Sequence, residues 1–153
     1  MRREIAHPLT AFEIRKQFKE LVKEAGEKGN QFFFAIRLKA DDRLIGFLQL
    51  PWIEWSNGVA ILRLGMAEAE DLRQYGREVL GLALVFIFNE LNLYRVTAPV
   101  TEYNTEYAAL YEQAGFTLEV RQREMCYRAG RRWDMLLYGC LAEDWGRIEK
   151  EAA

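Results

Sequence analysis

The chain has 153 residues, half of them hydrophobic, including nine Phe, seven Tyr and four Trp. This content excludes a disordered or low-complexity chain and predicts a single domain over residues 1–153 with a buried core. With a net charge of −2, the chain lacks the excess of basic residues that a general nucleic-acid binder has. The longest uncharged apolar stretch, Val79–Phe88, is shorter than the roughly 20 residues that span a membrane. With one His and two Cys, neither a metal cluster nor a disulfide framework is expected, so we expect a cytoplasmic protein.

The first predicted element is an amphipathic helix. Thr10 and Glu13 have the spacing of a capping box, in which hydroxyl and carboxylate satisfy the free amides of the first turn. Apolar residues then recur at helical spacing as far as Gly26, a typical C-terminal stop. We therefore expect a surface helix between Thr10 and Gly26.

Three strands are predicted next. Phe32–Leu38 and Leu44–Leu50 are short runs of aromatic and branched apolar residues around a polar turn, which is typical of an antiparallel hairpin. A loop over Pro51–Gly58 ends in a Ser-Asn-Gly turn signal, and Val59–Met66 has the composition of a third strand. A polar loop is expected from there to Gly76.

A central helix and a parallel strand are predicted to follow. Apolar residues surround almost the whole of a helix over Arg77–Leu91, which suits packing against a sheet. Asn92 can end this helix in a left-handed conformation, and Tyr94–Val100 then forms a strand parallel to the one before the helix. Pro99 cannot donate to a ladder, so one side of that strand should be unpaired there, at an edge or where two strands splay apart.

The C-terminal part is predicted as a helix and a long hairpin. Asn104 or Thr105 can cap a helix to Ala114, and Phe116–Tyr127 with Trp133–Leu141 form two strands around a glycine-containing turn. The expected fold class is therefore α+β: a mixed, mostly antiparallel central sheet with one parallel, splayed strand pair and flanking helices.

Several short strings are weak alone but occur in a specific order. They are Gly76–Leu80, Phe88–Val96, Asn104 with Leu110–Phe116, and Gly130–Asp134 followed by Glu143–Trp145. In these strings the chain resembles the GNAT superfamily of N-acetyltransferases, most closely the branch of ribosomal-protein N-terminal acetyltransferases. The resemblance covers about residues 32–145, between an N-terminal helical segment (1–30) and a charged tail (146–153). It implies acetyl-coenzyme A (acetyl-CoA) as the cosubstrate.

A cofactor site is expected along the crossover. Exposed amides at the start of the Arg77 helix, preceded by Gly76, would form a positive nest for the pyrophosphate of coenzyme A (CoA), unless Gly76 merely starts a buried helix. The loop departs from the family's pattern in either of two registers. Aligned on Glu78, it has Asp71 and Gln74 where Arg and the first Gly are expected, and a register that starts at Arg73 ends in Glu78. By the resemblance, the pantetheine arm is held by Leu64, Gly65, Met66 and Asn104 and would lie in the splay at Pro99, and the pyrophosphate is held by Arg73, Gln74, Tyr75, Gly76 and Arg77.

Acetyl transfer from a thioester to an amine needs a neutral amine, a donor for the oxyanion and an acid for the departing thiolate. The resemblance places Tyr111 near the sulfur, and a phenol with a pKa of about 10 is protonated at neutral pH. The alternative is a core tyrosine that shares a helix face with Tyr107, one turn earlier. A main-chain amide near Gly65 or Met66 is the expected oxyanion donor.

Two carboxylates and a group of arginines have no assigned role in the reaction. Glu54 and Glu102 could accept a proton through water, although each is more simply explained as a solvated carboxylate, so neither is assigned as the base. Five arginines of the last hairpin could guide an acidic partner, although a solvated face is the blander explanation: Arg121, Arg123, Arg128, Arg131 and Arg132.

The N-terminus departs from the family. Only nine residues precede the Thr10 helix, so the strand–helix unit that begins this fold is expected to be absent, shortened or supplied elsewhere. A truncated chain, a divergent member with a wider acceptor cleft, and a sheet edge completed by another subunit remain as explanations. An edge strand rich in phenylalanine, at Phe32–Phe34, favours a homodimer.

Three functions compete at this point. The first is an N-acetyltransferase that moves acetyl from acetyl-CoA directly to a primary amine of a protein N-terminus, a polyamine, an amino sugar or a small metabolite. The second is a noncatalytic acyl-CoA binding or protein-interaction module with a degenerate fold of this family. The third is a structural α+β domain without a cofactor.

Overall fold

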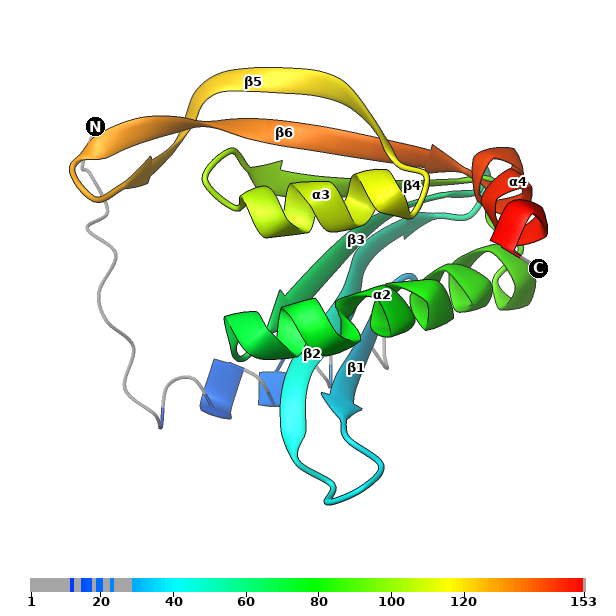
Figure 1. The fold of residues 1–153 in the computed structure, drawn as a ribbon, viewed down its shortest axis with the longest axis horizontal. Helices are drawn as coiled ribbons and strands as arrows, with labels where there is room; N and C mark the ends of the chain where they lie inside the picture. Colours follow the sequence, from blue (N-terminus) through cyan, green and yellow to red (C-terminus); the bar gives the residue numbers. More distant parts are fainter. Residues whose placement is uncertain (1–11, 13–14, 18, 21–22, 24–28, 153) are drawn as a thin grey trace.

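The computed structural model describes residues 12, 15–17, 19, 20, 23 and 29–152, and these form one twisted sheet flanked by helices (Figure 1). The six strands follow the order β1-β2-β3-β4-β6-β5, and only β3 and β4 are parallel. The predicted α+β class is therefore confirmed. The elements are β1 (Phe32–Arg37), β2 (Leu44–Glu54), β3 (Val59–Met66), α2 (Ala69–Val85), η1 (Phe86–Glu90), β4 (Arg95–Thr101), α3 (Thr105–Gln113), β5 (Thr117–Arg128), β6 (Arg131–Leu141) and α4 (Ala142–Ala152).

The first hairpin is confirmed, but its second strand is longer than predicted. β1 pairs antiparallel with β2 along its whole length. β2 does not end at Leu50 but continues through Pro51 to Glu54. Its pairing with β3 is irregular between Gln49 and Trp52, and such an irregularity accommodates Pro51, which has no amide to donate.

The central helix begins two turns earlier than predicted. α2 starts at Ala69, inside the segment expected as a polar loop. Good helix formers fill this segment, and the carboxylates of Glu70 and Asp71 in the first turn suit the positive end of the helix dipole. Gly76 is buried within the helix, where an added Cβ would lie 3.2 Å from Leu110 of α3. The prediction of a nest of free amides behind Gly76 is therefore wrong.

The helix ends through a wider π-helical turn. In η1 the Leu91 amide donates to the Phe86 carbonyl, five residues back, at 2.9 Å. Asn92 follows with a φ of 52°, the left-handed conformation that was predicted to end the helix. Phe86 packs edge-on against Phe32 and Phe34 of β1, with ring centroids 5.2 Å apart in each pair, so this turn anchors the helix to the first hairpin.

The parallel strands β3 and β4 pair only where they begin. Val59–Ile61 lie opposite Arg95–Thr97, and no pairing joins the two strands beyond these residues. On its other side, β4 pairs with β6 along its whole length, including Pro99 opposite Leu137. The side of Pro99 that faces β3 is therefore open, and the predicted splay is confirmed.

Left-handed residues end helix α3 and form the turn of the last hairpin. Gly115, with a φ of 93°, follows α3, and the amide of Phe116 donates to the carbonyl of Tyr111 at 3.0 Å, the arrangement of a Schellman motif. Ala129 and Gly130, with φ values of 51° and 77°, form the two-residue turn between β5 and β6.

The expected charged tail is a helix, α4, rather than a loose end. Trp145 fixes it: the side chain is buried and stacks on Phe88 of η1, with ring centroids 5.5 Å apart. Because this contact joins residues far apart in the sequence, the local charge pattern did not reveal it.

Two expectations concern the N-terminal segment. The helix expected over 10–26 and the missing first strand–helix unit fall largely outside the described residues. Within the described part, no helix is both long and apolar enough to cross a membrane.

Candidate active site

The splay between β3 and β4 opens into a cleft against α3. One cavity of about 280 Å³ lies between the diverging strand ends, and a second of about 350 Å³ lies beside the N-termini of α2 and α3. The two share Tyr103, Asn104 and Tyr107, so they form one elongated cleft. The first is lined by Leu64, Pro99, Val100, Thr101, Tyr103, Asn104, Tyr107, Tyr111 and Met135, and the second by Glu68, Ala69, Leu72, Tyr103, Asn104, Thr105, Glu106 and Tyr107.

Tyr111 is both a core residue and part of the cleft wall. Its side chain is 2% exposed, and its ring centroid lies 5.0 Å from that of Phe116 and 6.4 Å from that of Tyr138. Its hydroxyl has no hydrogen-bond partner in the described part of the chain. Burial raises the pKa of Tyr111 above that of an ordinary tyrosine, because the charged phenolate is poorly solvated there. The hydroxyl therefore keeps its proton over a wide pH range.

The three residues predicted to hold the pantetheine arm lie together at the end of β3 but are not equivalent. Leu64 lines the cavity between the strands. Gly65 packs against the ring of Phe47 and lines a separate small hollow. The Met66 amide is already engaged, because it donates a hydrogen bond to Tyr107 Oη at 2.9 Å.

Asn104 lies at the turn between β4 and α3. It lines both cavities, so it lies where the resemblance implies a contact with the arm. It occupies the N-cap position of α3 without a side-chain capping bond. Its Nδ2 instead donates to Thr101 Oγ1 at 2.8 Å, and this bond fixes the turn.

The free amides of α2 lie before the residues predicted to bind the pyrophosphate. The amides of Ala69, Glu70 and Asp71 belong to the first helical turn, which has no carbonyl partner within the helix, whereas the Leu72 amide donates to the Glu68 carbonyl at 3.2 Å. Later amides bond within the helix, so five predicted residues have no free amide to offer: Arg73, Gln74, Tyr75, Gly76 and Arg77.

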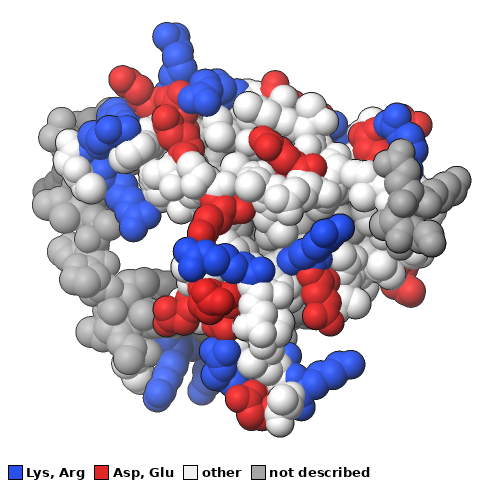
Figure 2. All heavy atoms as spheres, viewed as in Figure 1, with Lys and Arg blue, Asp and Glu red and all other residues white. Residues whose placement is uncertain are grey.

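Carboxylates surround this end of the cleft. Arg73 donates from Nε to Glu106 Oε1 at 2.9 Å and from Nη1 to Glu70 Oε2 at 3.4 Å. Asp71 is 5% exposed, and Arg43 binds it through two hydrogen bonds of 2.8 and 3.2 Å. Acidic and basic side chains alternate over the face that carries α2 and α3 (Figure 2). The positive charges at this end are thus balanced by the chain's own carboxylates.

The two carboxylates weighed as a general base are engaged elsewhere. Glu54 accepts a hydrogen bond from the hydroxyl of Ser56. Glu102 Oε2 accepts one from the Asp134 amide at 2.6 Å. Neither lines the cleft, so the structure adds no reason to assign either as the base.

Four of the five hairpin arginines contact groups of the hairpin or of the turn beside it. The contacts are Arg121 with Asp134 at 2.8 Å, Arg132 with the Glu124 carbonyl at 3.1 Å, Arg128 over the Tyr103 ring at 4.6 Å and Arg131 over the Trp133 ring at 3.4 Å. Because these arginines already contact groups of the chain itself, the hairpin is better explained as a solvated face than as a docking site for an acidic partner.

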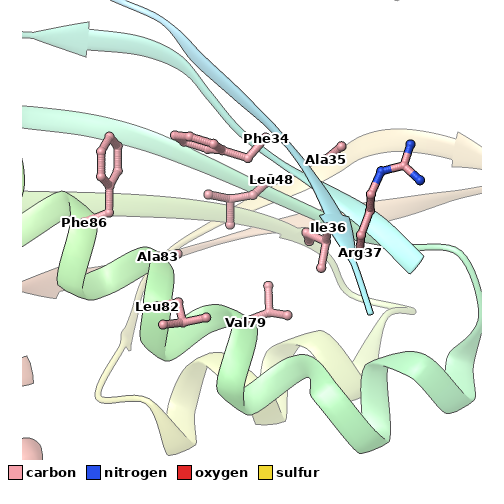
Figure 3. A pocket seen from close by; sticks show the side chains of 9 residues that line it. All are labelled: Phe34, Ala35, Ile36, Arg37, Leu48, Val79, Leu82, Ala83 and Phe86. Carbon is pink, nitrogen blue, oxygen red and sulfur yellow. The ribbon is translucent and has the colours of Figure 1, made fainter. Parts of the chain in front are cut away.

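A further groove, of about 350 Å³, lies away from this cleft between β1 and α2. Figure 3 shows Val79 and Phe86 pointing from the helix toward the strand, whereas the Arg37 guanidinium points away. Apart from Arg37, its lining is apolar, so the groove offers no group for acyl transfer.

The model of a family described as an acetyltransferase (GNAT) domain matches residues 9–137. The chain belongs to the GNAT acetyltransferase family. GNAT acetyltransferases use acetyl-CoA as the acetyl donor, so the expected GNAT superfamily, enzyme class and cosubstrate are confirmed. The noncatalytic and purely structural alternatives lose support accordingly. Within the described residues, no three His, Cys, Asp or Glu side chains gather as a metal site would require.

Similar proteins support this assignment. The SPbeta prophage-derived uncharacterized N-acetyltransferase YokL of Bacillus subtilis (strain 168) is 25% identical over 127 residues, which cover 83% of this chain and 71% of YokL. The spermidine N-acetyltransferase of Vibrio cholerae in complex with CoA and spermine has the same fold, with a TM-score of 0.79, 23% identity and coverage of 91% of this chain and 80% of that one. Its dodecameric form in an intermediate state has a TM-score of 0.77 at 24% identity, with 91% and 79% covered.

Tyr107 belongs to this cleft although the sequence did not predict it there. It was expected only as a helix neighbour of Tyr111, yet it lines both cavities and its hydroxyl accepts a hydrogen bond from the Met66 amide. The available signal was its position four residues before Tyr111, which puts both rings on one face of α3.

Proposed function

We propose that this chain transfers the acetyl group of acetyl-CoA directly to a primary amine in a ternary complex. The observation that carries the proposal is the cleft at the β3–β4 splay, with Tyr111 in its wall. Apolar side chains such as Leu64, Pro99 and Met135 line it together with tyrosines and Asn104. This mixture fits an extended arm that carries both methylene and amide groups.

The proposed chemistry uses few groups of the chain. Bound acetyl-CoA supplies the acetyl group as a thioester. Tyr111 Oη is the proposed proton donor to the departing sulfur, since burial keeps the hydroxyl protonated. A main-chain amide of Gly65 or Met66 is the proposed donor to the carbonyl oxygen that gains negative charge. No side chain is assigned to deprotonate the amine.

We assign the pyrophosphate to the free amides of Ala69, Glu70 and Asp71 rather than to a nest at Gly76. A helix N-terminus attracts anions through its unpaired amides and its dipole. Arg73, one turn further along α2, is the predicted cation nearest to these amides. Arg73 can bind the pyrophosphate only after its hydrogen bond to Glu106 breaks, and this cost weakens the affinity for CoA.

Two acceptor classes have an observation behind them. The strings of the sequence resemble ribosomal-protein N-terminal acetyltransferases, which favours a protein N-terminus as acceptor. The similar solved structures are spermidine N-acetyltransferases, which favours a polyamine. Amino sugars and small amine metabolites complete the set. We propose a cytoplasmic protein, which the two free cysteines suit.

We also propose a homodimer that forms along β1. Within the described sheet, β1 lies at the edge and pairs only with β2. Phe34 on this strand is 39% exposed, and an apolar edge strand favours association. Light scattering at micromolar concentration should give twice the mass of the chain, and a monomer would contradict the homodimer alone.

Two measurements test the proposed activity. Calorimetry with acetyl-CoA should show saturable binding to one site per chain. Thiol release from acetyl-CoA should then rise when a peptide N-terminus or a polyamine is added, with an amino sugar and a tertiary amine as further arms. Saturable binding without amine-dependent thiol release for any primary amine would support a binding module instead. Release that the tertiary amine stimulates equally would show hydrolysis rather than transfer.

A further inference from the structure

A tyrosine hydroxyl bridges the two walls of the cleft. Tyr107 projects from the first turn of α3, and its Oη accepts the hydrogen bond of the Met66 amide, at the last residue of β3, at 2.9 Å. β4 no longer pairs with β3 at this point, because their ladder stops at Ile61. The Met66 amide therefore has no strand partner toward β4, and the tyrosine supplies one in its place.

Tyr107 also stands between the two halves of the cleft. It lines the cavity that contains Tyr111 and the cavity at the N-terminus of α2. Tyr111 follows on the same face of α3, one turn away. An arm that reached from the free amides of α2 to Tyr111 would pass the Tyr107 ring and the Met66 amide.

We propose that Tyr107 is an internal latch whose hydroxyl occupies the Met66 amide until the arm of an acyl-CoA displaces it. The inference rests on the proposed function, since it assumes that acyl-CoA uses this cleft. Displacement breaks a hydrogen bond that the empty protein already has, so part of the binding free energy is lost. Tyr107 thus sets the affinity for the cofactor as a positioning residue, and it transfers no proton.

The test compares Tyr107→Phe with the unmodified protein in calorimetric titrations with CoA. Phenylalanine keeps the ring but removes the hydroxyl, so the ligand meets an unoccupied Met66 amide. A net hydrogen bond of typical strength corresponds to an increase in CoA affinity of about threefold to tenfold. Tyr94→Phe is the matched control, because Tyr94 is 58% exposed and lies outside both cavities; its affinity should not change.

Thermal unfolding separates a latch from a purely structural bond. The latch predicts that Tyr107→Phe lowers the melting temperature of the empty protein but increases the rise that saturating CoA produces. A structural bond predicts the same loss with and without CoA and no gain in affinity. Unchanged or weaker CoA binding by Tyr107→Phe overturns the latch, while amine-dependent thiol release by the unmodified protein leaves the proposed function standing. If neither protein binds CoA, both are overturned.

A measurement on the unmodified protein covers the case in which the variant does not fold. The Met66 amide should exchange slowly with solvent in the empty protein, and the NMR signals of the Tyr107 ring should shift when CoA is added, whereas those of Tyr94 should not. Fast exchange of the Met66 amide, or a Tyr107 ring indifferent to CoA, overturns the latch.

Discussion

The two ends of the cleft differ in how far the chain's own groups occupy them. At the splay, Tyr111 has a hydroxyl without a hydrogen-bond partner in the described residues, and the walls combine apolar side chains with neutral polar ones, none of them charged. At the N-terminus of α2, Glu106 lines the cavity and, together with Glu70, binds Arg73. The first end suits a neutral thioester arm, whereas the second resists an anion until its charges rearrange.

This difference follows from the sequence features on which each end depends. The splay depends on the strand backbones, because Pro99 has no amide to donate toward β3 and β4 pairs there only with β6. At the anion end, the first turn of α2 carries the carboxylates of Glu70 and Asp71. Helix-forming residues then extend α2 back to Ala69. Catalysis should therefore be sensitive to changes at the splay, and affinity should be adjustable at the other end.

The largest effect is expected from removing the proposed acid. Tyr111→Phe should lower kcat by at least about 100-fold, a typical contribution of a general acid. CoA affinity should change by less than about twofold, since the hydroxyl makes no hydrogen bond to the described residues whose loss would disturb the cleft. Thiol-release kinetics and calorimetry measure the two quantities.

Tyr138→Phe is a neighbouring control for this substitution. Tyr138 stacks on Tyr111, but its hydroxyl donates to Glu112 Oε1 at 3.0 Å, so this variant perturbs the same aromatic cluster without touching the proposed acid. It should keep most of the activity. A Tyr111→Phe variant that is as active as Tyr138→Phe would remove Tyr111 from the mechanism.

The pH profile should carry the signature of a buried phenol. Burial raises the pKa of Tyr111, so its protonated form, which acts as the acid, persists above the ordinary tyrosine pKa of about 10. The neutral form of an alkyl amine grows about tenfold per pH unit below its own pKa of about 10.4. We expect kcat/KM to rise steadily from pH 7 to 9 without an alkaline decline. A descending limb within that range would mean that a different, more acidic group delivers the proton.

Local features were predictable from the sequence, and long-range contacts were not. Pro99, Gly115 and Gly130 each impose a backbone constraint that can be inferred from a short window. The Tyr107–Met66 bond joins residues 41 positions apart, and no local pattern encodes it.

The start of α2 shows a second kind of failure. Gly76 before an apolar run has the appearance of a helix start, yet it packs against Leu72 and Leu110 in the helix interior. Because Gly76 has no side chain, α2 and α3 can approach each other closely; the glycine does not mark a helix start with free amides. Only the position of α3 reveals this, so the pyrophosphate residues were the least predictable part of the site.

A smaller effect is expected from the carboxylate that holds Arg73. Glu106→Gln removes one negative charge from the cavity wall and weakens the hold on Arg73. CoA affinity should rise by about twofold to fivefold at low salt, the scale of a single charge near a helix terminus. The gain should shrink at about 1 M salt, where the screening length is only about 3 Å. Glu78→Gln, further along the exposed face of α2, is the charge-matched control, and an equal gain there would show a mere effect of net charge.

The smallest effect is expected where a nest was first predicted. In Gly76→Ala the added Cβ would lie 3.0 Å from Leu72 Cδ1 and 3.2 Å from Leu110 Cδ2, the mobile ends of two side chains. A helix gains about 1 kcal/mol from Ala over Gly, which offsets this crowding, so the free energy of unfolding should change by less than about 1 kcal/mol. CoA affinity should stay within about twofold, because no Gly76 amide is free.

Gly76→Val should instead destabilise the protein by about 1–3 kcal/mol through overpacking. If Gly76→Ala lost most of its CoA affinity while remaining as stable as the parent, the cofactor would have to unwind the first turns of α2, and the anion site would belong at Gly76 after all.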